Sequence, residues 1–377
     1  MVTKRKLYIL VIHYHYIVTT YFIHKMDKII VKEIEYPKYM TRELAEMWAE
    51  GIPFFSDNDP QNPEWNPTPT IDIGLSEYGY GTVSVKDESV NPTHTIKDRP
   101  AWDNTTRYRT YGRLLLANGT AIEGKLVPRL TIITSGNNGK ALASMLNKYN
   151  CPPIKILADL KCPHLDELSK LHADVYIADL HNKCLTPELI KQITNNRNGV
   201  DLTSLVAFNP QKIFYDWHVH ESLNTGADDI YVPYGSGMIF ANYLTWQEIT
   251  LENEVDGKRD PRLKVDPMHV KDVNVLGAEP RRRRTSDADK LTKAFNPFVY
   301  FDKNDIQGLK SFDVTGNSTG VHSVPEEYIR GAYEILRKFV NTEPSGAAGL
   351  ALYMYRHDQG LVDPKKKALI INTGKGG

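Results

Sequence analysis

Cysteine is scarce in this sequence, and neither sign of charge is in excess. Three cysteines occur among 377 residues, Cys151, Cys162 and Cys184, and no two of them form a C-x-x-C pair. They therefore indicate neither a disulfide framework nor a zinc site, and they favour a reducing, cytoplasmic compartment. Because Lys plus Arg and Asp plus Glu each total 46, the formal net charge is zero. This balance argues against a nucleic-acid partner bound by bulk phosphate neutralisation.

Long apolar runs are scarce too, and the one present lies within residues 1–25. It extends from Leu7 to Ile23, near the lower length limit for a bilayer span, and carries His13 and His15 at its centre. No small-residue cleavage site of a signal peptide follows it. We interpret residues 1–25 as an extension of uncertain role and expect no membrane partner. A membrane anchor, an edge strand and an oligomer contact are the alternatives.

The rest of the chain has the composition and pattern of an α/β protein. Hydrophobic residues make up 41% and charged residues 24%, as in ordinary globular enzymes, and the length suits two domains. From residue 70 onward, short β-branched runs alternate with helical segments, which is typical of βαβ units. The expected strands are 82–86, 130–134, 154–158, 173–177, 230–233, 274–278 and 368–372, and the expected helices are 140–149, 163–171 and 325–340. The charged stretch 281–308 is expected to be a long surface excursion.

The first segment that carries chemistry is residues 86–99, K-D-E-S-V-N-P-T-H-T-I-K-D-R. Its turn signal at Asn91-Pro92 precedes Lys97, which should lie at the start of a helix. There the helix dipole and partial desolvation disfavour an ammonium group, so they favour a neutral amine that can form a Schiff base. The alternative is that a Lys-Asp-Arg triplet, considered alone, lies on a solvated helix face.

Two glycine-containing turns each connect a predicted strand to a predicted helix. In T-S-G-N-N-G-K, residues 134–140, the small residues and the helix N-terminus can offer amide donors to a carboxylate. The spacing is not that of a P-loop, and a plain strand–helix turn is the alternative. In V-P-Y-G-S-G-M-I-F, residues 232–240, the glycines supply the geometry of a phosphate cradle. Because Phe240 fills the last glycine position of a dinucleotide fingerprint, this loop suits a single phosphate better than a pyrophosphate.

The fourth feature is a pair of segments near the C-terminus, E-P-S-G-A-A at 343–348 and N-T-G-K-G at 372–376. Thr373 follows a predicted buried strand and can offer one hydroxyl to a site. Considered singly, each segment is a turn or a cap.

Together, and in this order, the four features resemble the fold-type-II family of pyridoxal-phosphate enzymes, the tryptophan synthase β superfamily. N-P-T-H-T-I-K-D-R is similar to the N-P-T-G-T-F-K-D-R of threonine synthases, T-S-G-N-N-G to their asparagine loop, and G-S-G-M to the glycine-rich phosphate loop. E-P-S-G-A-A is similar to a segment of threonine synthases and dehydratases. The resemblance covers roughly residues 65–377. It implies a two-domain α/β fold in which parallel or mixed sheets are flanked by helices. Residues 26–104 and 216–377 would form the large cofactor-binding domain, and residues 105–215 a small mobile domain.

The resemblance also implies roles for individual residues. Lys97 would hold pyridoxal 5'-phosphate as a Schiff base and later move protons at the substrate α-carbon. Asn137 would hydrogen-bond the phenolic oxygen of the cofactor, and Thr373 would face its pyridine nitrogen. The cofactor phosphate would be cradled by Gly235, Ser236, Gly237 and Met238. The substrate carboxylate would be held by Thr134, Ser135, Gly136 and Asn138.

The implied reaction is elimination or replacement on a small amino-acid substrate, with threonine synthase as the most similar pattern. A neutral hydroxyl at the pyridine nitrogen makes the ring a weaker electron sink than an aspartate would, which favours expulsion of a group from Cβ or Cγ. Cysteine synthase and serine or threonine dehydratase are the alternatives, and a catalytically silent relative that binds the cofactor is another. The resemblance also favours a homodimer.

Three positions depart from the family pattern. His94 stands where these families have glycine, and it is either a turn residue that points to solvent or an active-site group that touches substrate or phosphate. Ile96 replaces phenylalanine or valine, which changes packing alone. Pro100 follows Arg99 where a small residue is common, so the lysine-bearing helix is expected to begin late.

Two other candidates are weaker. The run Arg281 to Arg284 suits either a solvated loop or a docking patch for a phosphorylated substrate or an acidic partner. His218 and His220 are two apart on a predicted helix, so they point to different sides and do not share a metal. The sequence thus predicts no metal site.

Overall fold

The computed structural model describes most of the chain. The described residues are 29–49, 67–117, 122–134, 136–160, 162, 165–180, 187–197, 199–201, 215–281, 285–291 and 319–375. The N-terminal extension 1–25, Cys184, Ser135 and residues 282–284 of the arginine run lie outside them. Within the described part of the chain, no helix is long and apolar enough to cross a membrane.

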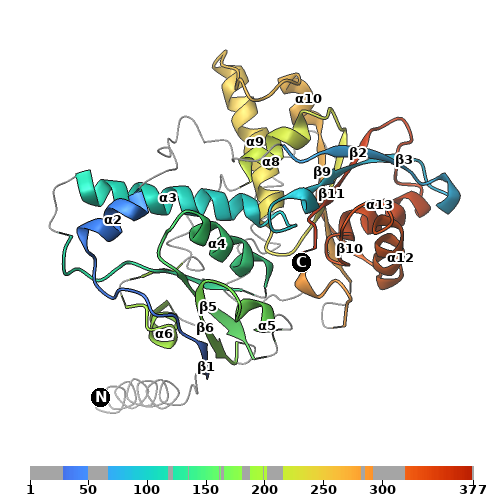
Figure 1. Cartoon of the computed structure of the whole chain (residues 1–377). Helices are drawn as coiled ribbons and strands as arrows, with labels where there is room; N and C mark the ends of the chain where they lie inside the picture. Colours follow the sequence, from blue (N-terminus) through green and yellow to red (C-terminus); the bar gives the residue numbers. More distant parts are fainter. Residues whose placement is uncertain are drawn as a thin grey trace, which may run out of the picture.

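The strands form two mixed, mostly parallel sheets, which lie in separate halves of the molecule (Figure 1). The smaller sheet has the order β1-β6-β5-β4-β7. Its parallel strands are β4 (Leu130–Ile133), β5 (Ile154–Asp159), β6 (Ala173–Ala178) and β7 (Val200–Asp201), and β1 (Ile29–Lys32) pairs antiparallel with β6. Every residue of β4 and β6 is buried, as expected for strands that are covered on both faces. Helices α4 (Asn137–Lys148), α5 (Leu165–Leu168) and α6 (Pro187–Ile193) connect these strands.

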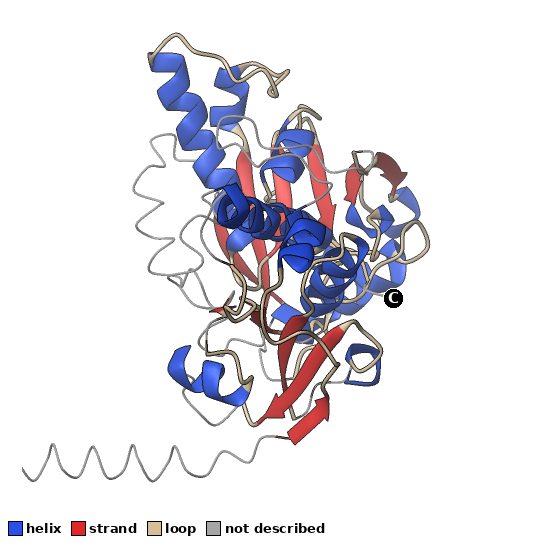
Figure 2. Ribbon diagram, turned by 60° about the vertical axis from the view of Figure 1, so that its left-hand side comes forward, coloured by secondary structure: helices blue, strands red, loops and turns tan. Residues whose placement is uncertain are grey.

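The larger sheet has the order β10-β9-β8-β11-β3-β2, in which all neighbours are parallel except β2 and β3. Its strands are β2 (Thr70–Gly74), β3 (Thr82–Asp87), β8 (Asp229–Pro233), β9 (Asn274–Pro280), β10 (Gly320–Val324) and β11 (Ala368–Asn372). Along β11, Leu369 and Ile371 pack with residues of α8 (Asp216–Leu223), α9 (Met238–Val255) and α10 (Pro267–Asp272). The intervening Ile370 packs with α12 (Glu326–Leu336) and α13 (Ala348–Asp358). Because successive side chains of a strand point to opposite faces, helices cover both faces of this sheet (Figure 2).

One long helix joins the two halves. Helix α3 (Asp98–Ala117) begins next to the larger sheet and runs to the smaller one (Figure 1). Its residues Trp102 and Tyr108 share a buried cluster with β4, β5 and α4. Helix α2 (Arg42–Ala49) packs against α3 in the same cluster, where the ring centroids of Trp48 and Tyr108 lie 4.4 Å apart. The chain therefore has a continuous packed connection between its two sheets.

The structure confirms the predicted α/β fold class and all seven predicted strands to within two residues. Helix α4 begins at Asn137, three residues earlier than predicted, because the asparagine turn forms its first turn. The helix predicted over residues 163–171 is shorter, since α5 has one turn. The domain boundaries stay a prediction. Strand β1, which lies in the segment 26–104 assigned to the large domain, pairs with β6 of the smaller sheet.

Candidate active site

Four of the sequence motifs lie at or after the carboxyl ends of parallel strands, whereas E-P-S-G-A-A lies between α12 and α13. Strands β3, β11 and β8 are adjacent in the larger sheet, and they end at Asp87, Asn372 and Pro233. The lysine, threonine and phosphate-loop segments follow these three ends and therefore meet at one edge of the sheet. In open α/β sheets, ligands bind in the crevice outside this edge.

The lysine segment is tied to the end of β11. The backbone N–H of Ile96 donates a 3.0 Å hydrogen bond to the carbonyl oxygen of Thr373, and the Thr95 hydroxyl donates one of 3.2 Å to the same oxygen. Gly374 fits closely under this turn, because a Cβ built there would collide with the backbone of His94. Lys97 directly precedes α3, which begins at Asp98, so it lies at a helix start as the turn signal before it predicts.

His94 lies in the turn before Lys97, with its side chain exposed. Its φ of 62° is in the left-handed region that favours glycine, the residue of the family pattern. Its Nδ1 lies 3.1 Å from the carbonyl oxygen of Ser89. The structure thus places His94 at the surface of the turn, and its contact with substrate stays a prediction.

The amine of Lys97 is half-buried and has a single described polar contact. Its Nζ donates a 3.0 Å hydrogen bond to the hydroxyl of Tyr215, and no carboxylate among the described residues pairs with it. An amine without a neutralising anion is suited to attack an aldehyde once it loses its proton. Sequence reasoning missed Tyr215, because an isolated tyrosine before a helix carries no motif.

Lys97 is followed by two residues that lie inside the protein. Asp98 is fully buried and Arg99 is 3% exposed, so the alternative of a solvated helix face for this triplet is wrong. Burial raises the pKa of Asp98 to about 6. The N–H and the hydroxyl of Thr93 each donate a 2.9 Å hydrogen bond to its carboxylate, and these bonds lower the pKa but do not offset the burial. The residue after the lysine is therefore fixed to the turn before it.

Arg99 anchors the helix start in a buried ion network. Its guanidinium donates to Glu88 at 3.0 and 3.1 Å and to Glu221 at 2.8 and 2.9 Å. Lys86 adds a 2.7 Å ion pair with Glu221, and Nδ1 of His218 lies 2.9 Å from Glu88. Although burial opposes ionisation, Arg99 and His218 hold the pKa of Glu88 well below its usual range. The network connects β3, α3 and α8 behind Lys97, and sequence reasoning did not anticipate it.

The asparagine turn connects β4 to α4. The Thr134 side-chain oxygen accepts hydrogen bonds from the backbone N–H groups of Gly136, at 3.1 Å, and Gly139, at 3.2 Å. Gly136, with a φ of 142°, is the N-cap of α4, and Asn137 and Asn138 form its first two residues with half-buried side chains. The turn therefore places the side-chain amides of Asn137 and Asn138 at a helix N-terminus, where an anion is favoured.

The phosphate loop connects β8 to α9 and fits the phosphate of the expected cofactor. Gly237 has a φ of 81° and is the N-cap of α9, with no side-chain hydrogen bond to the helix. The first amides of this 18-residue helix are thus left available at its positive end. Gly235, Ser236 and Met238 are half-buried around them. A backbone nest of this kind matches a single phosphate group.

A lysine outside every motif brings these loops together. Lys290 Nζ lies 3.4 Å from the side-chain oxygen of Asn137 and 2.5 Å from the carboxylate of Glu343, the first residue of E-P-S-G-A-A. The adjacent Leu291 lies 3.3 Å from a Cβ built on Gly235. The turn η4 (Asp289–Leu291) thus contacts three motifs. The predicted surface excursion over 281–308 is confirmed only in part for its described residues, because Arg281, Asp287 and Asp289 are exposed whereas Ala288 is fully buried.

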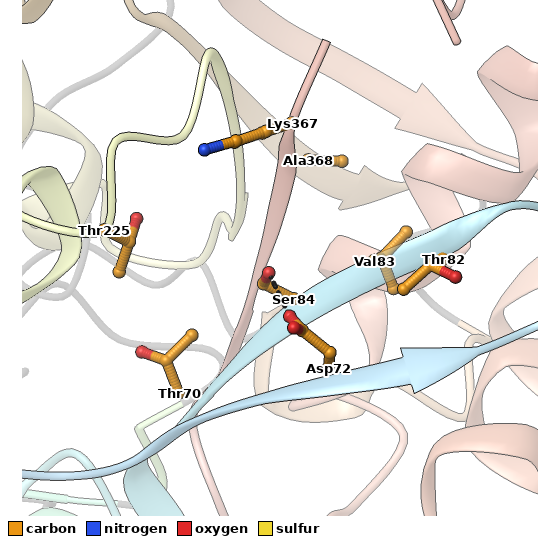
Figure 3. A pocket seen from close by; sticks show the side chains of 8 residues that line it. All are labelled: Thr70, Asp72, Thr82, Val83, Ser84, Thr225, Lys367 and Ala368. Atoms are coloured by element: carbon orange, nitrogen blue, oxygen red, sulfur yellow. Dashed lines mark hydrogen bonds between the residues drawn. The ribbon is translucent and has the colours of Figure 1, made fainter. Parts of the chain in front are cut away.

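One hollow in the larger sheet lies away from this crevice. It has a volume of about 510 Å³ and is lined by Thr70, Asp72, Thr82, Val83, Ser84, Thr225, Lys367 and Ala368 (Figure 3). It lies at the first residues of β3 and β11, away from the carboxyl ends that lead to the motifs. His218 and His220 are both buried in α8, and the described residues contain no metal-binding group of His, Cys, Asp or Glu.

Comparisons with solved structures give the same fold. Maize serine racemase is 16% identical at a TM-score of 0.54, covering 83% of this chain and 89% of that one. O-ureido-L-serine synthase is 19% identical at 0.56, covering 82% and 89%. Cysteine synthase from Entamoeba histolytica is 14% identical at 0.54, covering 92% and 91%. No curated protein sequence matches the chain.

The family itself is identified by sequence. The profile of the family described as "Pyridoxal-phosphate dependent enzyme" matches residues 62–374, which include all the motifs above except the last two residues of N-T-G-K-G. The cofactor of this family is pyridoxal 5'-phosphate, in agreement with the nest before α9 and with the Lys97 amine, which has no carboxylate partner among the described residues. The chain therefore belongs to the pyridoxal-phosphate dependent enzymes, with the fold-type-II architecture of the tryptophan synthase β superfamily.

Proposed function

We propose that this enzyme eliminates or replaces a group on an amino-acid substrate, in the manner of threonine synthase. The observation that carries the proposal is the position of the Lys97 amine, beside the end of β11 and without a carboxylate partner in the described structure. Cysteine synthase-type replacement and serine or threonine dehydration are the alternative reactions at the same site. The motif order supports the threonine synthase type.

When bound, pyridoxal phosphate withdraws electrons from the substrate α-carbon and so permits loss of the α-proton and of a leaving group. Lys97 would attach the cofactor and then exchange a proton with the α-carbon. Asn137 would donate to the phenolic oxygen, and Thr373 would face the pyridine nitrogen with a hydroxyl. The phosphate would be held by the backbone of Gly235, Ser236, Gly237 and Met238.

The substrate carboxylate would be held at the N-terminus of α4. Gly136 and Asn138 are the proposed N–H donors there, where the helix dipole favours an anion. The N–H of Gly136 donates to the Thr134 side chain in the structure, so it would have to leave that acceptor when the carboxylate binds. Thr134 and Ser135 are the other proposed contacts. The hydroxyl oxygen of Thr134 already accepts two backbone hydrogen bonds, so its remaining role is to donate its proton.

The smaller sheet would move to close over the substrate. Residues 105–215 carry the asparagine turn, and we propose that they form the mobile domain, with residues 26–104 and 216–377 as the large one. The contact between Lys290 and Asn137 spans this division, so it would re-form on each closure. We also propose a homodimer and a cytoplasmic location.

The reaction is tested with a panel of amino acids. Purified enzyme would be incubated with O-phosphohomoserine, serine, threonine and O-acetylserine, and the products identified by mass spectrometry. Threonine from O-phosphohomoserine is the expected result. A keto acid from serine or threonine would support the dehydratase, and S-containing product from O-acetylserine with sulfide would support the cysteine synthase. Cofactor binding without turnover of any substrate would show a catalytically silent relative.

A further inference from the structure

Tyr215 is the described partner of the Lys97 amine. Its hydroxyl lies 3.0 Å from Nζ, and the same nitrogen lies 5.7 Å from the centroid of the tyrosine ring. The residue is 1% exposed, so the contact is shielded from bulk water. No family motif includes this position.

The tyrosine is fixed in place from several sides. Its backbone N–H donates a 3.3 Å hydrogen bond to the side chain of Asn242 on α9, and its carbonyl oxygen accepts a 2.8 Å bond from Val219. Its ring shares a buried cluster with Ile96, the residue before Lys97, and with Tyr234 beside the phosphate loop. The packing of α8 and α9 therefore holds the hydroxyl towards the lysine.

The chemistry of the proposed reaction needs such a partner. If Lys97 holds the cofactor covalently, its nitrogen would serve as a base only after release. The released amine would then have to take up and give back a proton at the substrate α-carbon. A phenol both donates and accepts, so Tyr215 can donate to the neutral amine and accept from the ammonium. A charged donor makes the stronger bond, and the ring face adds attraction for a cation.

We propose that Tyr215 is a catalytic residue, which holds the released Lys97 amine and stabilises it after it has taken the substrate proton. The α-proton passes to Nζ and leaves again to the departing group or to the product carbon, so the balance of protons on the enzyme is restored in each turnover. The inference rests on the proposed function, because it requires that Lys97 is the attached and released amine.

The test compares Tyr215→Phe with Tyr243→Phe. Tyr243 is also fully buried, but its hydroxyl bonds to Nε2 of His218 at 3.0 Å and not to Lys97. Two readouts are needed. The first, independent of turnover, is the pH dependence of cofactor uptake by the apoprotein, followed by absorbance. The second is the steady-state rate together with exchange of the substrate α-proton for deuterium.

Tyr215→Phe should still become yellow, because the amine remains. The midpoint of cofactor uptake should move to lower pH by about 0.5–1 unit, since the ammonium loses an acceptor. We expect kcat and α-proton exchange to fall about 10- to 100-fold with little change in KM. Tyr243→Phe should match wild type in all of these. Incorporation of 3-fluorotyrosine at position 215, which changes acidity at nearly constant size, should shift the pH profile of kcat.

Two outcomes would overturn the inference and are distinguishable. If wild type binds the cofactor at Lys97 and turns over, but Tyr215→Phe behaves like Tyr243→Phe in midpoint and kcat, the inference alone fails. If wild type forms no covalent link at Lys97, the proposed function fails and the inference falls with it.

Discussion

Removing the charge of Glu88 should destabilise the protein more than a typical surface change does. The side chain is fully buried, and its carboxylate accepts five hydrogen bonds from four side chains. The donors are Thr68 at 2.7 Å, Asn91 at 2.6 Å, Arg99 at 3.0 and 3.1 Å, and His218 at 2.9 Å. Glu88→Gln keeps the shape but places an amide N–H₂ against donors. One or more of these groups would then lack a partner.

The magnitude follows from the charges of the network. Lys86 and Arg99 balance Glu88 and Glu221, so the substitution leaves one uncompensated positive charge in a buried site. Breaking a buried pair by removing one partner costs about 3–5 kcal/mol of unfolding free energy. The lowered pKa of Glu88 stabilises the folded state at pH values above the pKa that this carboxyl has in the unfolded chain. Wild type should therefore also lose unfolding free energy as the pH falls through the lowered pKa of the folded state.

The assay is urea denaturation of Glu88→Gln, with Glu46→Gln as the matched control. Glu46 forms a 2.9 Å pair with Arg42 one turn away on α2, but the two side chains are 52% and 71% exposed. The control should therefore lose only about 0.3–0.5 kcal/mol. A loss below about 1 kcal/mol for Glu88→Gln, or equal losses for both variants, would refute the view that the buried network holds the start of α3.

Three further predictions concern a buried acid and four glycines. Burial raises the pKa of Asp98 to about 6 from 3.8, so ionisation of this carboxyl costs the folded state free energy. As the pH rises from 4 to 7, the unfolding free energy of Asp98→Asn, measured by urea denaturation, should gain about 3 kcal/mol over that of wild type. A difference between the two proteins that does not change with pH would contradict this. Gly237→Ala, with a φ of 81° before α9, should weaken cofactor affinity about tenfold, measured by absorbance titration, whereas Gly257→Ala, with a φ of 66° after the same helix, should leave it unchanged. Gly349→Ala should lower stability by about 1–3 kcal/mol, because its Cβ would lie 2.6 Å from a β8 carbonyl oxygen. Gly331→Ala in α12 should raise stability by about 0.5–1 kcal/mol, because alanine favours a helix and the nearest atom to the new Cβ would be 3.6 Å away. Equal melting-temperature shifts for Gly349→Ala and Gly331→Ala would be inconsistent with the packing.

The strands were predictable because a buried strand shows its burial in the residue types of its own short segment. In β4, β6 and β11 every residue is buried, so each appears in the sequence as a mainly apolar segment, with Thr131, Asp174 and Asn372 as the polar exceptions. The loops after these strands were predictable for the same reason, since their glycines and asparagines stand at strand ends. The resemblance of four ordered motifs then identified the family.

The contacts between motifs were not predictable from local pattern. Lys290 lies in a charged stretch that suits a solvated loop, yet it meets Asn137 and Glu343, which are 153 and 53 residues away in the chain. Arg99 is a charged residue at a helix start, and only the carboxylates of Glu88 and Glu221 make its burial possible. Such long-range pairing depends on how the two sheets and α3 are packed, which no short window of sequence contains.

The central claim is that Lys97 is the amine that binds pyridoxal phosphate, and reduction with borohydride followed by peptide mapping tests it most directly. Lys290 is the internal control, because it is a second amine beside the asparagine turn. We expect a pyridoxyl group on the peptide that contains Lys97, none on the peptide that contains Lys290, and no yellow colour in Lys97→Ala. A label on Lys290, or no label on either peptide, would contradict the assignment.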